Sequence, residues 1–233
     1  MNEKLSKIIN SSDNIVFFGG AGVSTESGIP DFRSADGLYN QKYKYPPETI
    51  LSRRFLDNEP EIFFGFYREK MIYRDAKPNK AHYALAALEK SGKLKEIITQ
   101  NIDGLHQMAG SVNVLELHGS VNRNYCAECG AKYGLDAITA SAGVPKCACG
   151  GVIRPDVVLY GEFLATEVME RAARYVSRAD TLIIGGTSLS VYPAAGIVNY
   201  FSGRSLVLIN KTETSADGLA SLVIREPIGE AMG

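Results

Sequence analysis

The amino-acid sequence predicts an α/β fold built on a mostly parallel, doubly wound sheet. Short apolar runs of strand length alternate with segments of helical periodicity along the chain. Polar and glycine-rich stretches follow the apolar runs, as loops do at the carboxyl ends of parallel strands. The 233 residues, of which 45% are apolar, suffice for one α/β domain or for one large domain carrying a small insert.

Composition excludes several classes of function. The net charge of −1 gives no electrostatic footprint for nucleic acid or for an anionic membrane. No apolar run approaches the roughly 18 residues that a membrane span needs. Four cysteines without a secretory signal favour a reducing compartment, and therefore metal binding over disulfides. We expect a cytoplasmic monomer that contacts neither membrane nor nucleic acid directly.

The N-terminal part of the chain predicts a helix, a strand and a glycine loop. The spacing of Leu5, Ile8 and Ile9 predicts a short surface helix, and the apolar run 15–18 predicts a buried strand. The loop 19–22 then reads Gly-Gly-Ala-Gly, an arrangement that can present backbone N–H groups to a phosphate. The dinucleotide fingerprint is incomplete, because it ends on Thr25 and lacks the acidic residue about twenty positions on. Taken alone, the loop could equally be a tight turn into a helix.

The continuation of this loop, residues 27–33, reads Ser-Gly-Ile-Pro-Asp-Phe-Arg. Pro30 restricts the backbone here. We therefore expect Phe32 and Arg33, an aromatic ring and a fixed cation, to lie on an ordered loop.

The remaining elements follow in order. Residues 34–75 predict a mostly helical excursion from the sheet, since the aromatic side chains of 61–74 recur at helical spacing. A helix is predicted at 79–94, ended by Gly92, with His82 as a packing residue. Strands are predicted at 95–99, 112–117, 157–160, 181–184, 206–209 and 222–225, and helices are predicted at 166–176 and from Pro193 onward.

Polar residues collect after these strands, in the loops 19–33, 100–106, 118–119 and 185–188 and at Asn210. In open α/β sheets, ligands bind outside the carboxyl ends of the strands where the strand order reverses. The loops therefore predict one shared site.

The cysteines are spaced as a metal site. Cys126-x-x-Cys129 and Cys147-x-Cys149 lie on glycine-containing turns that can close a tetrahedron of thiolates around zinc. Four thiolates leave no open coordination position, so the metal should be structural. Two reduced pairs without metal are the alternative. Few basic side chains accompany the cysteines, which argues against a nucleic-acid-binding zinc ribbon.

Four polar residues are candidates for chemistry. His118 follows a predicted strand and precedes a glycine, and histidine can exchange a proton near neutral pH. His106 competes with it, although it could equally be a buried, hydrogen-bonded residue. Asn101 and Asp103 follow another strand, where ordinary turn chemistry would also place them.

Six stretches of the chain carry a family resemblance: GAGVSTESGIPDFR (20–33), TQNIDGLHQMAG (99–110), LELHGS (115–120), IRPDVVLYGE (153–162), GTSLSVYPAAG (186–196) and LIN (208–210). Together with the cysteine quartet, and in this order and spacing, they resemble the motifs of the sirtuins, NAD-dependent protein lysine deacylases. The resemblance spans nearly the whole chain. It implies a Rossmann-like NAD-binding domain (1–33, 76–120 and 154–233) and a small domain made of a helical module (34–75) and a zinc module (121–153). An acetylated-lysine peptide would enter the cleft between them.

The resemblance also implies roles for single residues. The dinucleotide would contact Ala21, Thr25, Phe32, Arg33, Gln100, Asn101, Ile102, Asp103, His118, Thr187, Ser188, Asn210 and Ile228. His118 would be the catalytic base, with Asn101 and Asp103 in catalytic roles. The substrate backbone would pair with a strand that includes Val157, Val158, Tyr160 and Gly161, a form of β-augmentation. Zinc would be held by Cys126, Cys129, Cys147 and Cys149.

The reaction implied is transfer of the acyl group from lysine to ADP-ribose, with release of nicotinamide from NAD. Gly19 and Ser34 depart from the family pattern, and we expect both to be tolerated. Sirtuins that favour succinyl or malonyl lysine resemble one another in a Tyr-x-x-Arg pair; the nearest match here, Tyr67 with Lys70, lacks the bidentate grip of arginine on a carboxylate. We therefore expect neutral acyl groups, acetyl first. Mono-ADP-ribosyl transfer, long-chain deacylation and non-catalytic NAD sensing are the alternatives.

Overall fold

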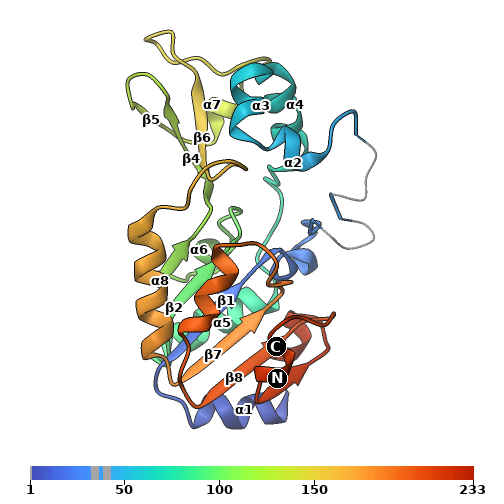
Figure 1. The fold of residues 1–233 in the computed structure, drawn as a ribbon, viewed down its shortest axis with the longest axis vertical. Coiled ribbons are helices and arrows are strands. Elements are labelled where there is room, and N and C mark those ends of the chain that lie inside the picture. The colour runs from blue at the N-terminus through green and yellow to red at the C-terminus, as the bar shows by residue number, and fades with distance from the viewer. Residues whose placement is uncertain (1, 33–36, 39–42) are drawn as a thin grey trace.

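A six-stranded parallel sheet forms the larger part of the molecule, as the sequence predicts. The computed structural model describes residues 2–32, 37–38 and 43–233. The sheet has the strand order β3-β2-β1-β7-β8-β9, and all neighbouring strands are parallel (Figure 1). The order reverses between β1 and β7, which makes the sheet doubly wound. The strands are β1 Ile15–Gly19, β2 Leu94–Thr99, β3 Val114–Glu116, β7 Thr181–Gly185, β8 Ser205–Ile209 and β9 Leu222–Ile224.

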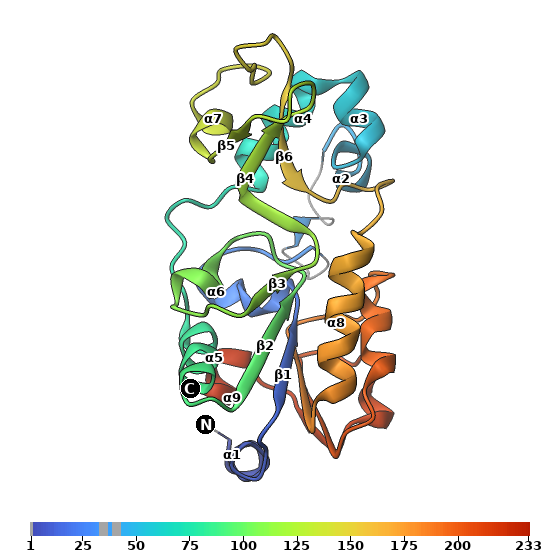
Figure 2. The same cartoon turned by 90° about the vertical axis from the view of Figure 1, so that its left-hand side faces the viewer.

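Helices cover both faces of this sheet (Figure 2). On one face lie α8 Thr166–Arg178 and the 3₁₀ helix η4 Ala194–Tyr200, whose apolar side chains pack against Val16 and Phe18 of β1. On the other face, α1 Glu3–Asn10, α5 Lys80–Lys90 and α9 Ile228–Met232 pack against Ile15 and Phe17. Successive side chains of a strand point to opposite faces, so a strand covered on both sides reads as the continuous apolar run seen at 15–18.

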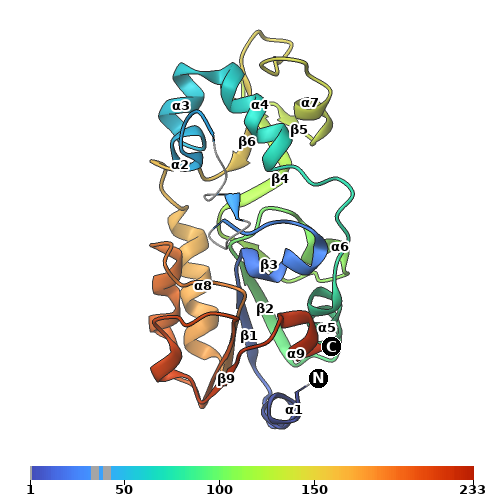
Figure 3. The ribbon, with the colours of Figure 1, turned by 90° about the vertical axis from the view of Figure 1, so that its right-hand side faces the viewer.

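A second, smaller group of elements lies beyond the carboxyl ends of the parallel strands (Figure 3). It contains an antiparallel sheet of order β5-β4-β6, formed by β4 Gly119–Cys126, β5 Lys132–Tyr133 and β6 Ile153–Val157. Four short helices accompany it: α2 Pro47–Ile50, α3 Arg53–Asn58, α4 Pro60–Lys70 and α7 Asp136–Thr139. Phe63, Phe64 and Tyr67 of α4 join Val121 and Ile153 in one apolar core.

The predicted strand at 157–160 is wrong. The strand in this region is β6, which ends at Val157 and pairs antiparallel with β4 from Gly119 to Cys126. Beyond Val157 the chain turns toward α3, where Tyr160 makes an isolated bridge with Ser52. The apolar character of 157–160 arises from packing in the small core and along the cleft, because Val157 and Leu159 are both buried there.

The other predicted elements are confirmed, with shifts at their ends. The N-terminal helix forms, although Leu5 and Ile9 are buried under the sheet. The helix expected from Pro193 is a 3₁₀ helix starting at Ala194. The glycine loop leads into short 3₁₀ turns, η1 Ala21–Val23 and η2 Thr25–Ser27, instead of a longer helix; α6 Leu105–Met108 and η5 Asp217–Leu219 complete the chain. Within the described residues, no helix is long and apolar enough to span a membrane.

Candidate functional site

A cleft of about 1280 Å³ lies between the carboxyl edge of the parallel sheet and the smaller group of elements. Loops that follow β1, β2, β7 and β8 line one side, and residues of β6 and α4 line the other. The cleft therefore includes the point between β1 and β7 where the strand order reverses, the expected ligand position in this class of sheet.

Two glycine loops meet backbone to backbone at the floor of this cleft. Gly22 N donates to Gly186 O at 2.8 Å, and Gly20 N donates to Gly185 O at 3.2 Å. A Cβ atom on Gly22 would lie 2.8 Å from Gly186 Cα, so any residue other than glycine would clash there. The loop after β1 is therefore held against the loop after β7, and both line the cleft.

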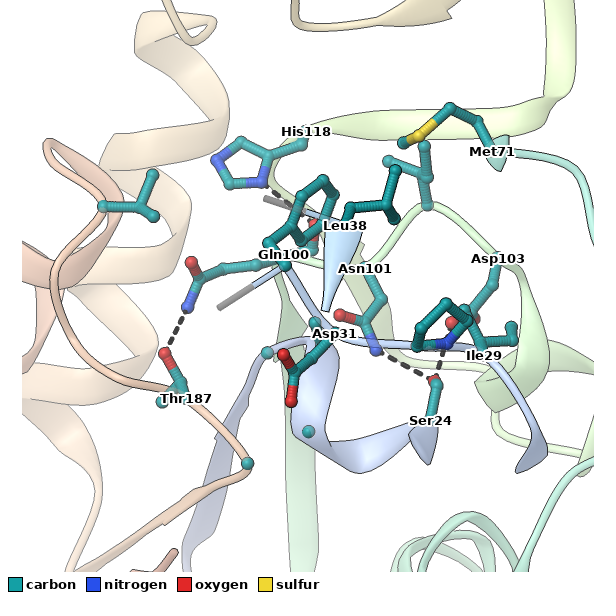
Figure 4. A pocket seen from close by; sticks show the side chains of 18 of the residues that line it. Ser24, Ile29, Asp31, Leu38, Met71, Gln100, Asn101, Asp103, His118 and Thr187 are labelled. Carbon is teal, nitrogen blue, oxygen red and sulfur yellow. Dashed lines mark hydrogen bonds between the residues drawn. The ribbon is translucent and has the colours of Figure 1, made fainter. Parts of the chain in front are cut away.

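Ser24, Asn101 and Asp103 form a hydrogen-bonded network beside these loops (Figure 4). Ser24 Oγ donates to Asp103 Oδ2 at 2.7 Å and accepts from Asn101 Nδ2 at 3.0 Å. Asp103 Oδ1 also accepts the N–H of Leu105, so both carboxylate oxygens have partners. Asn101 and Asp103 thus do more than shape a turn. The sequence prediction missed Ser24, since a hydroxyl in a Ser/Thr-rich loop gives no signal of its partners.

His118 lies on the same cleft, between β3 and β4. Its Nδ1 is 2.9 Å from the Gln100 carbonyl oxygen. A carbonyl can only accept, so Nδ1 carries the proton and Nε2 is left with a free lone pair. Burial lowers the pKa of His118 below its usual value, and the bond to Gln100 offsets this only in part. The side chain is therefore a neutral base at pH 7.

We expect this lowered pKa to appear in the pH profile of catalysis. A histidine base is active only when neutral, so a reaction that used His118 as its base should keep kcat/KM level as pH falls from 8 to about 6.5 and lose it only below the ordinary histidine value of about 6.5. Initial rates at subsaturating peptide, measured between about pH 5 and 8 with circular dichroism to verify folding, check this. An acid limb centred above about pH 7 would contradict a buried, neutral base.

His106, the competing candidate, does not line the cleft. It is 1% exposed, and its ring packs 4.8 Å from the ring of His82 and 6.2 Å from that of Phe17. Neither ring nitrogen bonds to any group in the described part of the chain. Burial lowers the pKa of His106 to about 3 and that of His82 to about 4.

These two buried imidazoles predict an acid-labile fold. Both are neutral in the folded state, whereas in the unfolded chain they take up protons near pH 6.5. The unfolded state then binds more protons between pH 6.5 and about 4, so stability should fall with pH in this window by up to about 1.4 kcal/mol per pH unit for each imidazole. Urea titrations across this range measure it. His106→Phe should flatten the slope; an unchanged slope would contradict the assignment.

The residues predicted to contact the dinucleotide lie around the same cleft, apart from Arg33, which lies outside the described residues. Those on the cleft wall are Ala21, Thr25, Phe32, Gln100, Asn101, Ile102, Asp103, His118, Thr187, Ser188, Asn210 and Ile228. Gln100 Nε2 donates to Thr187 Oγ1 at 3.0 Å and so joins the ends of β2 and β7.

The segment predicted to pair with a peptide lines the opposite wall. Val157, Val158, Tyr160 and Gly161 all border the cleft. Val158 N donates to the carbonyl of His118 at 3.0 Å, and the backbone of Tyr160 bonds to Leu51 and Arg53. Among the described residues, no group bonds the Val158 carbonyl or the Gly161 backbone. An extended chain could bond these groups by β-augmentation.

The four cysteines come together at the end of β4 farthest from His118. Their Sγ atoms all lie within 4.8 Å of one another, with 3.5 Å between Cys126 and Cys149 and 3.6 Å between Cys129 and Cys147. A tetrahedral Zn²⁺ with bonds of about 2.3 Å separates its sulfur ligands by about 3.8 Å. A Cβ on Gly151 would lie 2.7 Å from Cys126 Sγ, which explains the glycine there. The thiols fit a closed, structural zinc site.

Comparison with known proteins agrees with this geometry. The model of the Sir2 family matches residues 20–193. An NAD-dependent protein deacetylase of Clostridium perfringens is 62% identical over 99% of this chain and 96% of its own. A solved Sir2 homologue–NAD complex shares 43% identity, with a TM-score of 0.89 over 100% of this chain and 91% of its own. A Sir2 complex with a deacetylated p53 peptide and 3′-O-acetyl ADP-ribose shares 41% identity, with a TM-score of 0.90 over 100% of this chain and 96% of its own. The chain belongs to the Sir2 family.

Proposed function

We propose that the protein is an NAD-dependent protein lysine deacetylase that transfers the acetyl group to ADP-ribose. The observation that carries this proposal is the convergence of a neutral His118, the Ser24–Asn101–Asp103 network and an open peptide-pairing segment on one cleft. The similar proteins support it, since they are named NAD-dependent protein deacetylases or were solved with NAD or acetyl ADP-ribose.

NAD supplies the ribose carbon that loses nicotinamide and the ribose hydroxyl that finally carries the acetyl group. Asn101 and Asp103, fixed by Ser24, would orient the nicotinamide half, and Thr187, Ser188, Asn210 and Ile228 would bind the adenosine half. The side chains of Phe32 and Ile102 pack against the apolar core of the smaller group of elements and border the cleft, so they would exclude water from the reacting centre.

His118 would move the proton in this reaction. Its Nε2 is free because Nδ1 donates to Gln100, and it would take the proton of a ribose hydroxyl as that oxygen attacks the acyl carbon. The Val158 N–H, bonded to the His118 carbonyl, ties the peptide segment to this base. The acyl carbon of a lysine paired with that segment would thereby be held near Nε2.

The acyl pocket supports a neutral acyl group. Lys70, which occupies the sequence position of the arginine in a Tyr-x-x-Arg pair, lies 2.9 Å from Glu69 in an ion pair. Tyr67 is fully buried, and burial raises the pKa of its hydroxyl far above the usual value, so it stays neutral. Neither side chain offers a free charge to the carboxylate of a succinyl group.

Matched peptides that carry acetyl, succinyl or a long-chain acyl lysine test the proposal. The acetyl peptide should be turned over only with NAD and with the highest kcat/KM. Attachment of ADP-ribose to protein without loss of acetyl would instead establish ADP-ribosyl transfer. NAD binding without turnover of any acyl peptide would indicate that the protein senses NAD and does not catalyse deacylation.

We also propose that the enzyme acts as a cytoplasmic monomer on acetylated-lysine proteins, without direct contact with nucleic acid or membrane. The net charge of −1 supports the exclusion of nucleic acid. The proposed domain division is that expected from the sequence. Strand β6 pairs with β4 in the small sheet. This pairing favours moving the end of the zinc module from residue 153 to the end of β6 at Val157.

A further inference from the structure

An ion pair between a buried arginine and a half-buried glutamate closes the segment 157–162, which begins at the last residue of β6 and borders the cleft. Arg154, on β6, is 5% exposed. Its Nη1 and Nη2 donate to the two carboxylate oxygens of Glu162 at 2.7 and 3.0 Å. This is the bidentate geometry that gives arginine–carboxylate pairs both strength and directionality. The two ends of the segment are thus joined through one guanidinium.

Glu162 is bound by more than Arg154. Its Oε2 accepts the N–H of Leu159 at 2.9 Å, and Arg53 Nη1 lies 3.5 Å from its Oε1. Burial raises the pKa of Glu162, but the bonds from Arg154, the Leu159 N–H and Arg53 together outweigh it, and the net pKa is lowered. The carboxylate is therefore ionised at neutral pH and holds the middle of the segment as well as its end.

The same contacts fix the backbone around the open peptide-pairing groups. Arg154 Nη2 also lies 3.4 Å from the Val157 carbonyl, and Glu162 N donates to the Leu159 carbonyl at 2.9 Å, which closes a turn through Gly161. Gly161 has a φ of 88°, in the left-handed region. Val158 and Gly161, whose groups remain open toward a peptide, thus lie inside a loop closed by the ion pair.

A hydrogen bond also fixes the position of this loop relative to His118, the proposed base. Val158 N bonds to the carbonyl of His118, whose side chain bonds in turn to Gln100. A rigid loop on one side and a fixed imidazole on the other set the distance between the peptide backbone and Nε2. If the loop shifted, its open backbone groups would no longer line up with an extended peptide, so the peptide would bind more weakly and its KM would rise.

We propose that Arg154 and Glu162 are positioning residues, which hold segment 157–162 so that a bound acyl-lysine strand lies in register with His118. Neither residue touches the reacting atoms in this account. The inference rests on the proposed function, because it assigns a role within the peptide site of that reaction. It gives a role to two residues that the sequence motifs include only as part of the stretch 153–162.

The test is Glu162→Gln, which keeps the size of the side chain and removes its charge. We expect kcat/KM for an acetyl-lysine peptide to fall about 10- to 100-fold, mainly through KM, while the Kd for NAD stays unchanged. Asp156→Asn is the matched control. Asp156 also lies on β6, but it precedes the segment 157–162 and pairs with Arg123. Removing this ion pair should leave the peptide KM unchanged.

A double variant separates positioning from folding. Arg154→Met with Glu162→Met replaces the buried pair by apolar side chains, a change that buried ion pairs often tolerate in stability. We expect its Tm to return toward that of the unaltered protein while the peptide KM stays high, because the Leu159 N–H has lost its acceptor. A peptide KM that recovers together with Tm would overturn the proposal, since packing alone would then suffice.

The remaining outcomes are also decisive. Glu162→Gln with an unchanged peptide KM, in a protein that deacetylates normally, overturns the positioning role and leaves the proposed function intact. An unaltered protein that binds NAD but removes no acyl group from any peptide overturns both.

Discussion

Replacing His118 with alanine is expected to reduce deacetylation by about 10²- to 10⁴-fold, the usual contribution of a general base. The loss should appear in kcat, because the proposed role of the imidazole is to take a proton during the reaction. Its Nδ1 bonds only to a backbone carbonyl, and its pKa is lowered by burial, so no ion pair depends on it. The Kd for NAD, measured by calorimetry, should stay close to that of the unaltered protein.

His106→Leu is the matched control for this variant. It also removes a buried imidazole, but one that does not line the cleft, so turnover per folded molecule should persist. Retention of turnover by His118→Ala would remove His118 as the base. Loss of NAD binding together with turnover would instead assign it a structural role.

Replacing Cys147 with serine is expected to unfold the small sheet. The four Sγ atoms join the turn between β4 and β5 to the loop before β6. A metal bound there would add to the backbone hydrogen bonds that these loops make, such as Ala127 N to Val152 O at 2.9 Å and Cys147 N to Gly151 O at 2.8 Å. Structural zinc contributes about 10–16 kcal/mol of binding free energy in zinc-finger peptides, more than the whole stability of many domains. Metal analysis should find one zinc per chain in the unaltered protein and none in the variant. Hydrogen exchange of β4–β6 should accelerate strongly.

Lys146→Ala serves as the control, because it changes the neighbouring side chain and leaves all four thiols in place. This variant should retain its zinc, and the amides of β4–β6 should stay protected from hydrogen exchange. A metal-free Cys147→Ser protein that is well folded and fully active would refute a structural zinc site. Slow exchange in β1, β7 and β8 should survive in the variant, since these strands pack in cores that contain no cysteine.

The parallel sheet was predictable because each of its central strands is covered on both faces. A strand of that kind is mostly apolar, as at 15–18 and 182–184, and such runs stand out in a sequence. Strand β4 was missed because its burial follows neither a continuous run nor a clean alternation; Asn122 and Arg123 are exposed within it. The run 157–160 was mistaken for a strand because periodicity cannot separate strand pairing from burial against a neighbouring core.

The candidate site was predictable to the extent that it follows from topology. Asn101, Asp103 and His118 follow parallel strands, and the carboxyl ends of such strands share one edge. Contacts that depend on loop packing left no such signal. Ser24 reaches Asp103 across 79 positions of sequence. Arg154 and Glu162 are only 8 positions apart, but their pairing requires the chain to turn back over residues 159–162, whereas the predicted strand ran straight through 157–160.

The central claim is that the acetyl group passes from lysine to ADP-ribose, and one measurement tests it directly. The protein is incubated with NAD and a peptide whose lysine carries a ¹³C-labelled acetyl group, and the products are separated and weighed by mass spectrometry. We expect label in acetyl-ADP-ribose, with free nicotinamide and deacetylated peptide in equal amounts. Label found only in free acetate from the first turnovers, or deacetylation that proceeds without NAD, would contradict the account.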